Sequence, residues 1–348
     1  MNELSTVDAR ATAGVAAPND ALSRRRLLAF RLGRGPGADH WIRVFRRAMA
    51  CRFEVTLSGE DARHVHVARG ALDEADRLEA ALTVFNDSSD LMQVNRHAAT
   101  GPVGVDAELF ALLDRCRTLH AETDGAFDIT STPLSRCWGF LSRDGHLPSA
   151  DALDAARAVV GMSRVTINHG WVLFDRPGVE LNLGSIGKGY AVQQIGLRLR
   201  AQGVRHALVS AASSSILAIG GRGHGWCIDL HSRLATRGPL ARFFVRNGAV
   251  GTSGTGEQFV EINGTRYGHV IDPRTGWPAA AGMLSASVVT RDAATADALA
   301  TAFFVGGIDL ARRYCDTHAD TLALLTLDDG SERPQIVGRY PGALVEAL

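Results

Sequence analysis

The sequence predicts an α+β protein in which helices pack on sheets, and three observations support this class. Apolar residues recur at helical spacing over residues 61–85, so one face of a long helix should cover a core. The second half of the chain is dense in short strand-like runs, with two helices inserted at 186–202 and 293–305. Strands and helices do not alternate strictly, which argues against a regular parallel Rossmann sheet.

The remaining elements follow from alternation, capping residues and turns. A strand is expected at 52–58 and a helical turn at 91–95. Asp106 should cap a helix that stops near Gly125, and Ser149 should begin one that ends at Gly161. Short strands should flank the turn at 168–170. Further strands are expected at 179–183, 206–210, 216–219, 226–230, 243–252, 259–271 and 283–290.

Composition limits the possible function classes. Lys plus Arg and Asp plus Glu number 37 each in 348 residues, so no net charge favours nucleic acid or an anionic membrane. No apolar run approaches the about 18 residues that a membrane-spanning helix needs, so we expect no integral membrane segment. The five cysteines are scattered without C-x-x-C spacing, which argues against disulfides or a zinc site.

The N-terminal region differs from the rest of the chain. Residues 1–40 are rich in Ala, Arg, Gly and Asp and lack a periodic apolar face, so we expect a disordered extension followed by a single domain at 41–348. The run S-R-R-R-L-L at 23–28 resembles a twin-arginine export signal. Its apolar segment stops at Arg31 and Arg34, and no small-residue cleavage site follows. The sequence favours a cytoplasmic location and leaves export as the alternative.

Residues 267–278 hold the most constrained chemistry in the chain, with the sequence Y-G-H-V-I-D-P-R-T-G-W-P. Asn263-Gly264 is a strong hairpin signal, so His269 and Asp272 should arrive at the end of a hairpin strand. Histidine titrates near neutrality, and next to a carboxylate it can serve as a general acid or base. The alternative is a hydrogen-bonded turn that only caps the strand.

A second candidate is N-L-G-S-I-G-K-G-Y at 182–190, where a strand gives way to a glycine-rich turn that opens a helix. Such a turn lets the backbone approach an anion, and Lys188 could lie over a pyrophosphate. The stretch lacks the phosphate-loop spacing. Glycines that only allow tight packing are the alternative.

Two further stretches could contact a ligand. In D-A-L-A-T at 297–301, the i, i+4 spacing places Asp297 and Thr301 on one helical face, and hard oxygen atoms suit magnesium. The alternative is that both residues only bond local backbone. T-D-G-A-F-D at 123–128 could frame a planar ring, or could be a structural turn.

Taken in order, these stretches resemble the ApbE family, the FAD:protein FMN transferases. The resemblance extends from about residue 48 to about residue 307 and rests on seven motifs: A-M-A-C-R-F-E-V, L-T-V-F-N-D-S-S-D-L-M-Q-V-N, T-D-G-A-F-D-I-T, L-N-L-G-S-I-G-K-G-Y-A, S-G-T-G-E-Q-F-V-E-I-N-G, H-V-I-D-P-R-T-G-W-P and A-D-A-L-A-T-A-F-F-V-G-G. It implies a mixed-sheet, T-fold-like α+β architecture and one flavin transferase domain at 41–348.

The resemblance also implies an activity. Members bind FAD as substrate, use Mg²⁺ to cleave its pyrophosphate, and pass FMN to a Thr or Ser hydroxyl of an acceptor flavoprotein with release of AMP. The alternatives are hydrolysis of FAD to FMN and AMP, or FAD binding without transfer. A scaffold that binds no ligand is the remaining hypothesis.

Carried over by motif, His269 is the candidate catalytic residue. The resemblance implies a metal site made of Asp297, the Thr301 hydroxyl and the backbone carbonyl of Ser185. The residues that it implies for FAD binding are Met49, Phe85, Ala126, Phe127, Asp128, Asn182, Lys188 and Ile271.

Three positions and one stretch depart from the family pattern. Asn182 stands where many relatives have Asp, and Phe85 replaces a common Tyr. Residues 211–215, A-A-S-S-S, replace a glycine-rich stretch and could reshape one wall of the pocket. Ala300 lacks a carboxylate that some members add beside the metal.

Overall fold

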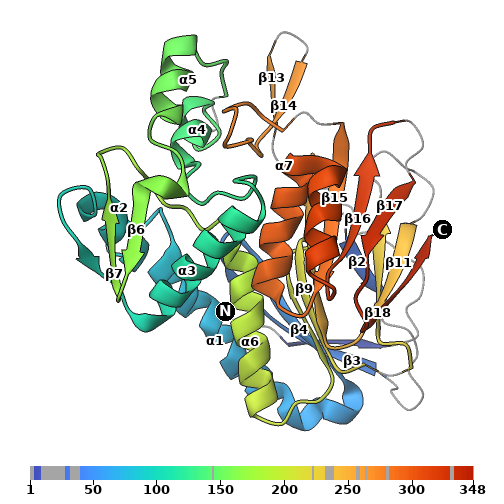
Figure 1. The fold of residues 1–348 in the computed structure, drawn as a ribbon. Helices are drawn as coiled ribbons and strands as arrows, with labels where there is room; N and C mark the ends of the chain where they lie inside the picture. Colours follow the sequence, from blue (N-terminus) through green and yellow to red (C-terminus); the bar gives the residue numbers. More distant parts are fainter. Residues whose placement is uncertain are drawn as a thin grey trace.

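A large antiparallel sheet forms the centre of the computed structural model (Figure 1), which describes residues 4–8, 28–31, 40–142, 145–221, 223–231, 239–255, 259–262, 265–279, 282–329 and 333–347. Within these ranges the sheet has nine strands, and each neighbouring pair is antiparallel. In spatial order they are β1 (Leu4–Asp8), β3 (His40–Ala48), β4 (Cys51–Ser58), β8 (Ala207–Ala211), β9 (Ser215–Ile219), β12 (Gly248–Gly254), β15 (Met283–Thr290), β16 (Leu322–Leu327) and β17 (Pro334–Gly338). The predicted α+β class is confirmed.

Both faces of the large sheet are covered. Alternate side chains, such as Val209 and Leu217, pack with helices α1 (Val65–Leu82), α6 (Gly187–Ala201) and α7 (Ala293–Thr317). Their neighbours in the sequence, such as Leu208 and Ile216, pack against a second sheet. The strand order of that sheet is β18 (Ala343–Ala347), β11 (Pro239–Val245), β10 (Trp226–His231) and β2 (Leu28–Arg31). Because both faces are buried, the central strands are continuous apolar runs rather than alternating ones.

Smaller elements surround one end of the large sheet. Figure 1 shows α4 (Thr132–Cys137), α5 (Ala150–Arg157) and the hairpin of β13 (Phe259–Ile262) and β14 (Thr265–Gly268) together at the top. Below them lie α2 (Asp90–His97), α3 (Ala107–Glu122) and a three-stranded sheet of β5 (Val103–Gly104), β7 (Trp171–Phe174) and β6 (Val165–Asn168). The 3₁₀-helices η1 (Gly59–His64) and η2 (Met162–Arg164) complete the elements described.

Local sequence signals located several elements correctly. Asp106 Oδ1 accepts a hydrogen bond from Leu109 N at 2.7 Å at the start of α3, as expected for an N-cap. Ser149 Oγ caps α5 in the same way through Ala152 N at 3.2 Å. The hairpin β13–β14 is also confirmed, although Asn263 and Gly264 themselves lie outside the described residues.

Several predicted boundaries were wrong, and helix α5 ends at Arg157 instead of at Gly161. Helix α7 continues past Val305 to Thr317. Gly307 has a non-helical backbone conformation (φ 73°), which glycine adopts at little cost, and the helix continues after it. The run 243–252 is two strands, separated by a turn in which Asn247 (φ 50°) accepts a hydrogen bond from Gly220 N through its side chain. Residues 179–183 form no strand, since Leu181 N donates to the side chain of Asn95 instead of to a neighbouring strand.

The N-terminal prediction is only partly covered by the structure. Within 1–40 it describes strands β1 and β2 and the first residue of β3. Residues 23–27 of the twin-arginine-like run lie outside the described residues, so the cellular location stays a prediction.

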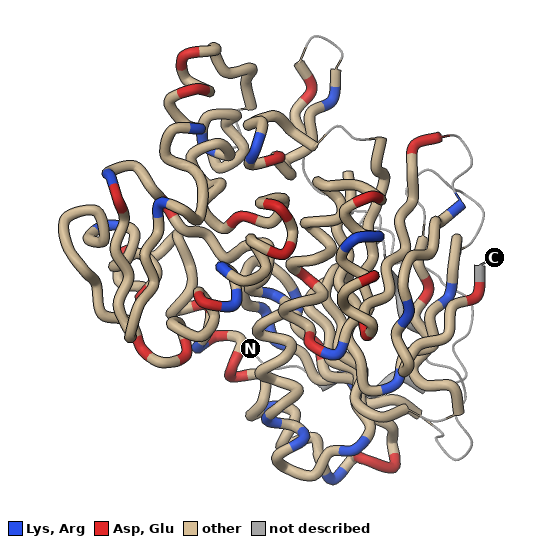
Figure 2. Tube along the Cα trace, in the orientation of Figure 1, with Lys and Arg blue, Asp and Glu red and all other residues tan. Residues whose placement is uncertain are grey.

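The charge distribution and the burial of α7 are consistent with the expectations from composition. Figure 2 shows Lys and Arg interspersed with Asp and Glu along the described part of the chain. By length and composition α7 could cross a membrane, but 67% of its most apolar window is buried inside the protein. It packs there on β12 and β15.

Helix α7 approaches β12 so closely that Gly251 has no room for a side chain. A Cβ at this position would lie 2.3 Å from Ala296 O and 2.6 Å from Asp297 N. We expect Gly251→Ala to lower the free energy of unfolding in urea by about 1–3 kcal/mol or more, because the backbone of α7 must shift. The matched control is Gly70→Ala on the exposed side of α1, where no atom lies within 4 Å. That change should raise stability by about 0.5–1 kcal/mol, and equal losses in both variants would contradict the close packing.

Candidate functional site

A cavity of about 280 Å³ lies where α4, the start of α6, the end of β12, α7 and the loop after β14 meet. The sequence prediction named twelve site residues, and nine of them line this cavity. They are Ala126, Asp128, Asn182, Ser185, Lys188, His269, Ile271, Asp297 and Thr301. Segments far apart in the chain therefore come together at one place.

Three predicted FAD-binding residues do not line the cavity. Phe85 is 83% exposed in the loop between α1 and α2. Phe127 is fully buried in the main core, so its side chain points away from the cavity that Ala126 and Asp128 line. Met49 is half-buried in the β3–β4 turn, where it packs against the same core. Their proposed roles stay predictions.

The carboxylate of Asp297 is the best-positioned polar group in the cavity. It is 5% exposed. Ser215 Oγ donates to its Oδ1 at 2.9 Å, and Gly189 N donates to its Oδ2 at 2.9 Å. A buried carboxylate requires such donors, and together they fix its orientation at the cavity wall. Gly189 can approach because it lacks a Cβ, which would lie 2.2 Å from Ala293 O.

Thr301 lies one helical turn beyond Asp297, as the i, i+4 spacing predicted. Its Oγ1 is 3.0 Å from Ser253 Oγ and 3.5 Å from the backbone oxygen of Asp297. The second contact is the local back-bond named as the alternative, but it is long for a hydrogen bond between oxygen atoms. Thr301 therefore combines a side-chain partner on β12 with a position on the cavity wall.

The oxygen atoms that line the cavity suit a hard cation whose remaining ligands are water and the phosphates of a bound substrate. Within the described ranges, no group of three or more His, Cys, Asp or Glu side chains could hold a metal by itself. The cavity instead offers the Asp297 carboxylate together with the hydroxyl oxygens of Thr301 and Ser253, and Ser185 also lines it. Mg²⁺ is commonly bound by one or two carboxylates plus water and substrate phosphates, so these residues fit Mg²⁺.

Lys188 and Asn182 contribute polar groups near the start of α6. Lys188 is half-buried, and its ammonium forms no ion pair with any other residue that the structure describes. Asn182 Oδ1 accepts a hydrogen bond from Gly184 N at 2.8 Å, so the side-chain nitrogen is the group that remains for a ligand. Both residues line the cavity and can favour an anionic or carbonyl-bearing partner.

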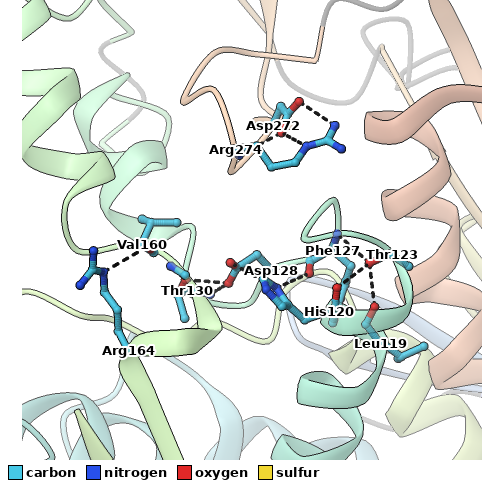
Figure 3. A network of polar contacts seen from close by, with 11 residues as sticks. Leu119, His120, Thr123, Phe127, Asp128, Thr130, Val160, Arg164, Asp272 and Arg274 are labelled. Carbon is cyan, nitrogen blue, oxygen red and sulfur yellow. Dashed lines mark hydrogen bonds and ion pairs between the residues drawn. The ribbon is translucent and has the colours of Figure 1, made fainter. Parts of the chain in front are cut away.

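His269 is half-buried in the cavity wall, but Asp272 is engaged elsewhere. The two carboxylate oxygens of Asp272 accept hydrogen bonds from Arg274 Nε and a terminal guanidinium nitrogen, each at 2.8 Å (Figure 3). This pairing raises the pKa of Arg274. Asp272 O also accepts from Gly276 N at 2.8 Å and closes the turn. The turn-capping alternative therefore describes Asp272, whereas His269 faces the cavity.

Asp128 places a second buried carboxyl group on the wall. Its Oδ1 accepts hydrogen bonds from Thr130 N at 2.7 Å and Thr130 Oγ1 at 2.6 Å, and its Oδ2 lies 3.4 Å from His120 Nδ1. Figure 3 shows this cluster beside the loop that carries Phe127. Burial raises the pKa of Asp128, and the bonds from Thr130 and the charge of His120 oppose that rise.

Sequence reasoning missed the hydroxyl residues of the cavity. Several line it without having been named as site residues: Ser131, Thr132, Ser135, Ser214, Thr252 and Ser253. Ser214 belongs to residues 211–215, the stretch that differs from the family pattern and could reshape one wall of the pocket. Ser253 lies within the S-G-T-G motif. The available signal was only the density of Ser and Thr near glycine-rich turns.

Comparison with known proteins identifies relatives of this chain. The sequence profile of the ApbE family matches residues 49–326. The FAD:protein FMN transferase of Treponema pallidum is 32% identical, and the match covers 74% of this chain and 76% of the relative. The FAD:protein FMN transferase of Vibrio cholerae is 28% identical, and the match covers 74% of this chain and 80% of the relative. The crystal structure of the ApbE protein of Thermotoga maritima has a TM-score of 0.76 at 26% identity, with 86% of this chain and 97% of that chain covered.

The raised pKa of Asp128 predicts how stability changes with pH. The folded protein binds this proton more tightly than the unfolded chain does. The stabilisation of wild type relative to Asp128→Asn should therefore be greatest below the unfolded pKa of about 3.9 and should be lost as the pH rises through the folded-state pKa. The loss is at most about 1.4 kcal/mol for each pH unit crossed.

Urea unfolding between pH 4 and pH 8 measures this difference. Asp114→Asn on the exposed side of α3 is the matched control for removal of one carboxylate. A wild-type advantage that grows with pH would show that the site favours the charged form of Asp128.

Proposed function

This chain belongs to the ApbE family, and from that premise we propose that it is an FAD:protein FMN transferase. FAD binds in the cavity as substrate, FMN passes to a Thr or Ser hydroxyl of an acceptor flavoprotein, and AMP is released. The observation that carries this proposal is the convergence of His269, Lys188 and the buried Asp297 on one cavity. The names of the relatives support the choice of substrate.

The reaction is a phosphoryl transfer at the diphosphate of FAD. The acceptor hydroxyl oxygen attacks the phosphorus of the FMN half, and the bond from that phosphorus to the bridging oxygen breaks, so that AMP leaves. His269 is proposed to take the hydroxyl proton as general base. Lys188 lies on the same cavity and is suited to balance the charge on the leaving phosphate.

Mg²⁺ would be held by Asp297, the Thr301 hydroxyl and the backbone carbonyl of Ser185. When bound, it would supply neutralisation of the negative charge on the diphosphate. The contribution of the chain is orientation, because Ser215 and Gly189 hold the two oxygens of Asp297 in one geometry. Groups that hydrogen-bond to a metal-ligating side chain commonly change the affinity of the site for the metal.

The rest of the nucleotide would be held by the other walls. Ala126 and Ile271 offer apolar surface suited to a flavin ring, and Asp128 and Asn182 offer polar groups beside it. Phe85 lies outside this cavity and could reach FAD only from its exposed loop. Met49 and Phe127 could contribute through backbone atoms or packing.

An assay with FAD, Mg²⁺ and flavin-depleted protein extract from the source organism tests the proposal. A transferase should produce an acceptor band whose flavin fluorescence survives denaturation and acid, together with AMP. His269→Ala should lower this transfer by roughly 10²- to 10⁴-fold while FAD binding is kept, since loss of a general base removes only the proton transfer. Formation of AMP without any protein-bound flavin would show an FAD pyrophosphatase instead.

Asp297→Asn tests the metal site. The variant loses a negative charge and brings an amide group to the N–H of Gly189. We expect the Mg²⁺ concentration for half-maximal transfer to rise at least roughly tenfold, since loss of even an outer-shell partner costs about 10- to 100-fold in metal affinity. Ser215→Ala keeps the carboxylate and should produce a smaller rise. An unchanged magnesium dependence in Asp297→Asn would remove this residue from the metal site.

A further inference from the structure

Ser214 is a buried cavity residue whose hydroxyl is not used by the fold. It lies in the turn between β8 and β9, is 6% exposed and lines the cavity. Its Oγ forms no hydrogen bond with any residue in the described part of the chain. Most buried polar side chains are paired, and an unpaired one costs about 1–3 kcal/mol. A buried hydroxyl without a partner in the fold is therefore a candidate for a hydrogen bond to a ligand.

The backbone fixes where the hydroxyl lies. Ser214 O accepts a hydrogen bond from Thr252 N at 2.8 Å, which attaches the turn to β12. The next residue, Ser215, donates its hydroxyl to Asp297. Ser214 is therefore held on the wall that carries Asp297 and Thr301, beside the proposed metal site.

Unpaired hydroxyls are concentrated at this cavity. Among the described residues, the buried hydroxyls without a partner belong to Thr132, Ser214 and Thr326. Thr132 and Ser214 both line the cavity, whereas Thr326 lies on β16 away from it. Unpaired hydroxyls at a cavity wall are expected if these hydroxyls form hydrogen bonds with a bound ligand.

We propose that Ser214 Oγ donates a hydrogen bond to a phosphoryl oxygen of the bound dinucleotide. This assignment rests on the proposed function, because the proximity of Asp297 identifies the neighbouring part of FAD as its diphosphate. Ser214 is a substrate-contacting residue in addition to those implied by the family motifs. A hydroxyl can donate to a phosphate oxygen without adding charge, which suits a wall that already carries a buried carboxylate.

Ser214→Ala tests the assignment through binding. FAD, ADP and riboflavin are titrated against wild type and variant, once with Mg²⁺ and once with a chelator. FAD and ADP share the diphosphate, so their affinities should fall by roughly 10- to 100-fold, the range for one hydrogen bond to a charged group. Riboflavin lacks phosphate, and its affinity should not change. The losses should be present under both metal conditions.

Stability without ligand provides a second readout. Ser214→Ala removes a buried hydroxyl that has no partner in the fold, so its melting temperature should equal or exceed that of wild type. Thr326→Val is the matched control, because it removes an unpaired buried hydroxyl outside the cavity. It should leave stability equal or higher and should not change the affinity for FAD or ADP.

Three outcomes would overturn the assignment while FAD binding by wild type persists. They are unchanged ADP affinity in Ser214→Ala, an equal loss of riboflavin affinity, and a loss seen only with Mg²⁺, which would make Ser214 a metal contact. If wild type binds neither FAD nor ADP, the proposed function fails, and the Ser214 assignment fails with it.

Discussion

The close approach of α7 to β12 and α6 is the constraint on which the site depends. Gly251 and Gly189 leave no space for a side chain at these contacts. Their absence of Cβ atoms lets the helix come near enough for Asp297 to accept hydrogen bonds from Ser215 and from the backbone of Gly189. A buried charge without those donors would be strongly unfavourable. The packing that closes the core therefore also orients the carboxylate.

The other side of the cavity is held by aromatic packing instead of charge. Trp138 Nε1 donates to Gly276 O at 2.9 Å, and its ring centroid lies 5.2 Å from that of Tyr267 and 5.1 Å from that of Trp277. These contacts join α4 to the segment that follows β14, which includes His269. A loop that is anchored on both sides of a histidine can hold it in place, as catalysis by positioning requires.

Local signals in the sequence were enough for features determined by a few neighbouring residues. The cap at Asp106, the hairpin and the shared face of Asp297 and Thr301 are of this kind. Features that depend on distant partners were not predictable. The continuation of α7 beyond Gly307 follows from packing on the sheet, and the pairing of Asp272 with Arg274 competes with the expected histidine partner. Nothing in three consecutive serines indicates which one faces the cavity.

The walls of the cavity come from segments spread between Ala126 and Thr301, so no single loop forms the binding site alone. A nucleotide bound there would contact α4, α6, β12 and α7 together, so it would bind the folded domain and not the unfolded chain. Binding free energy is then coupled to cooperative unfolding of the whole domain, and resistance to heat and proteolysis increases with the concentration of the nucleotide.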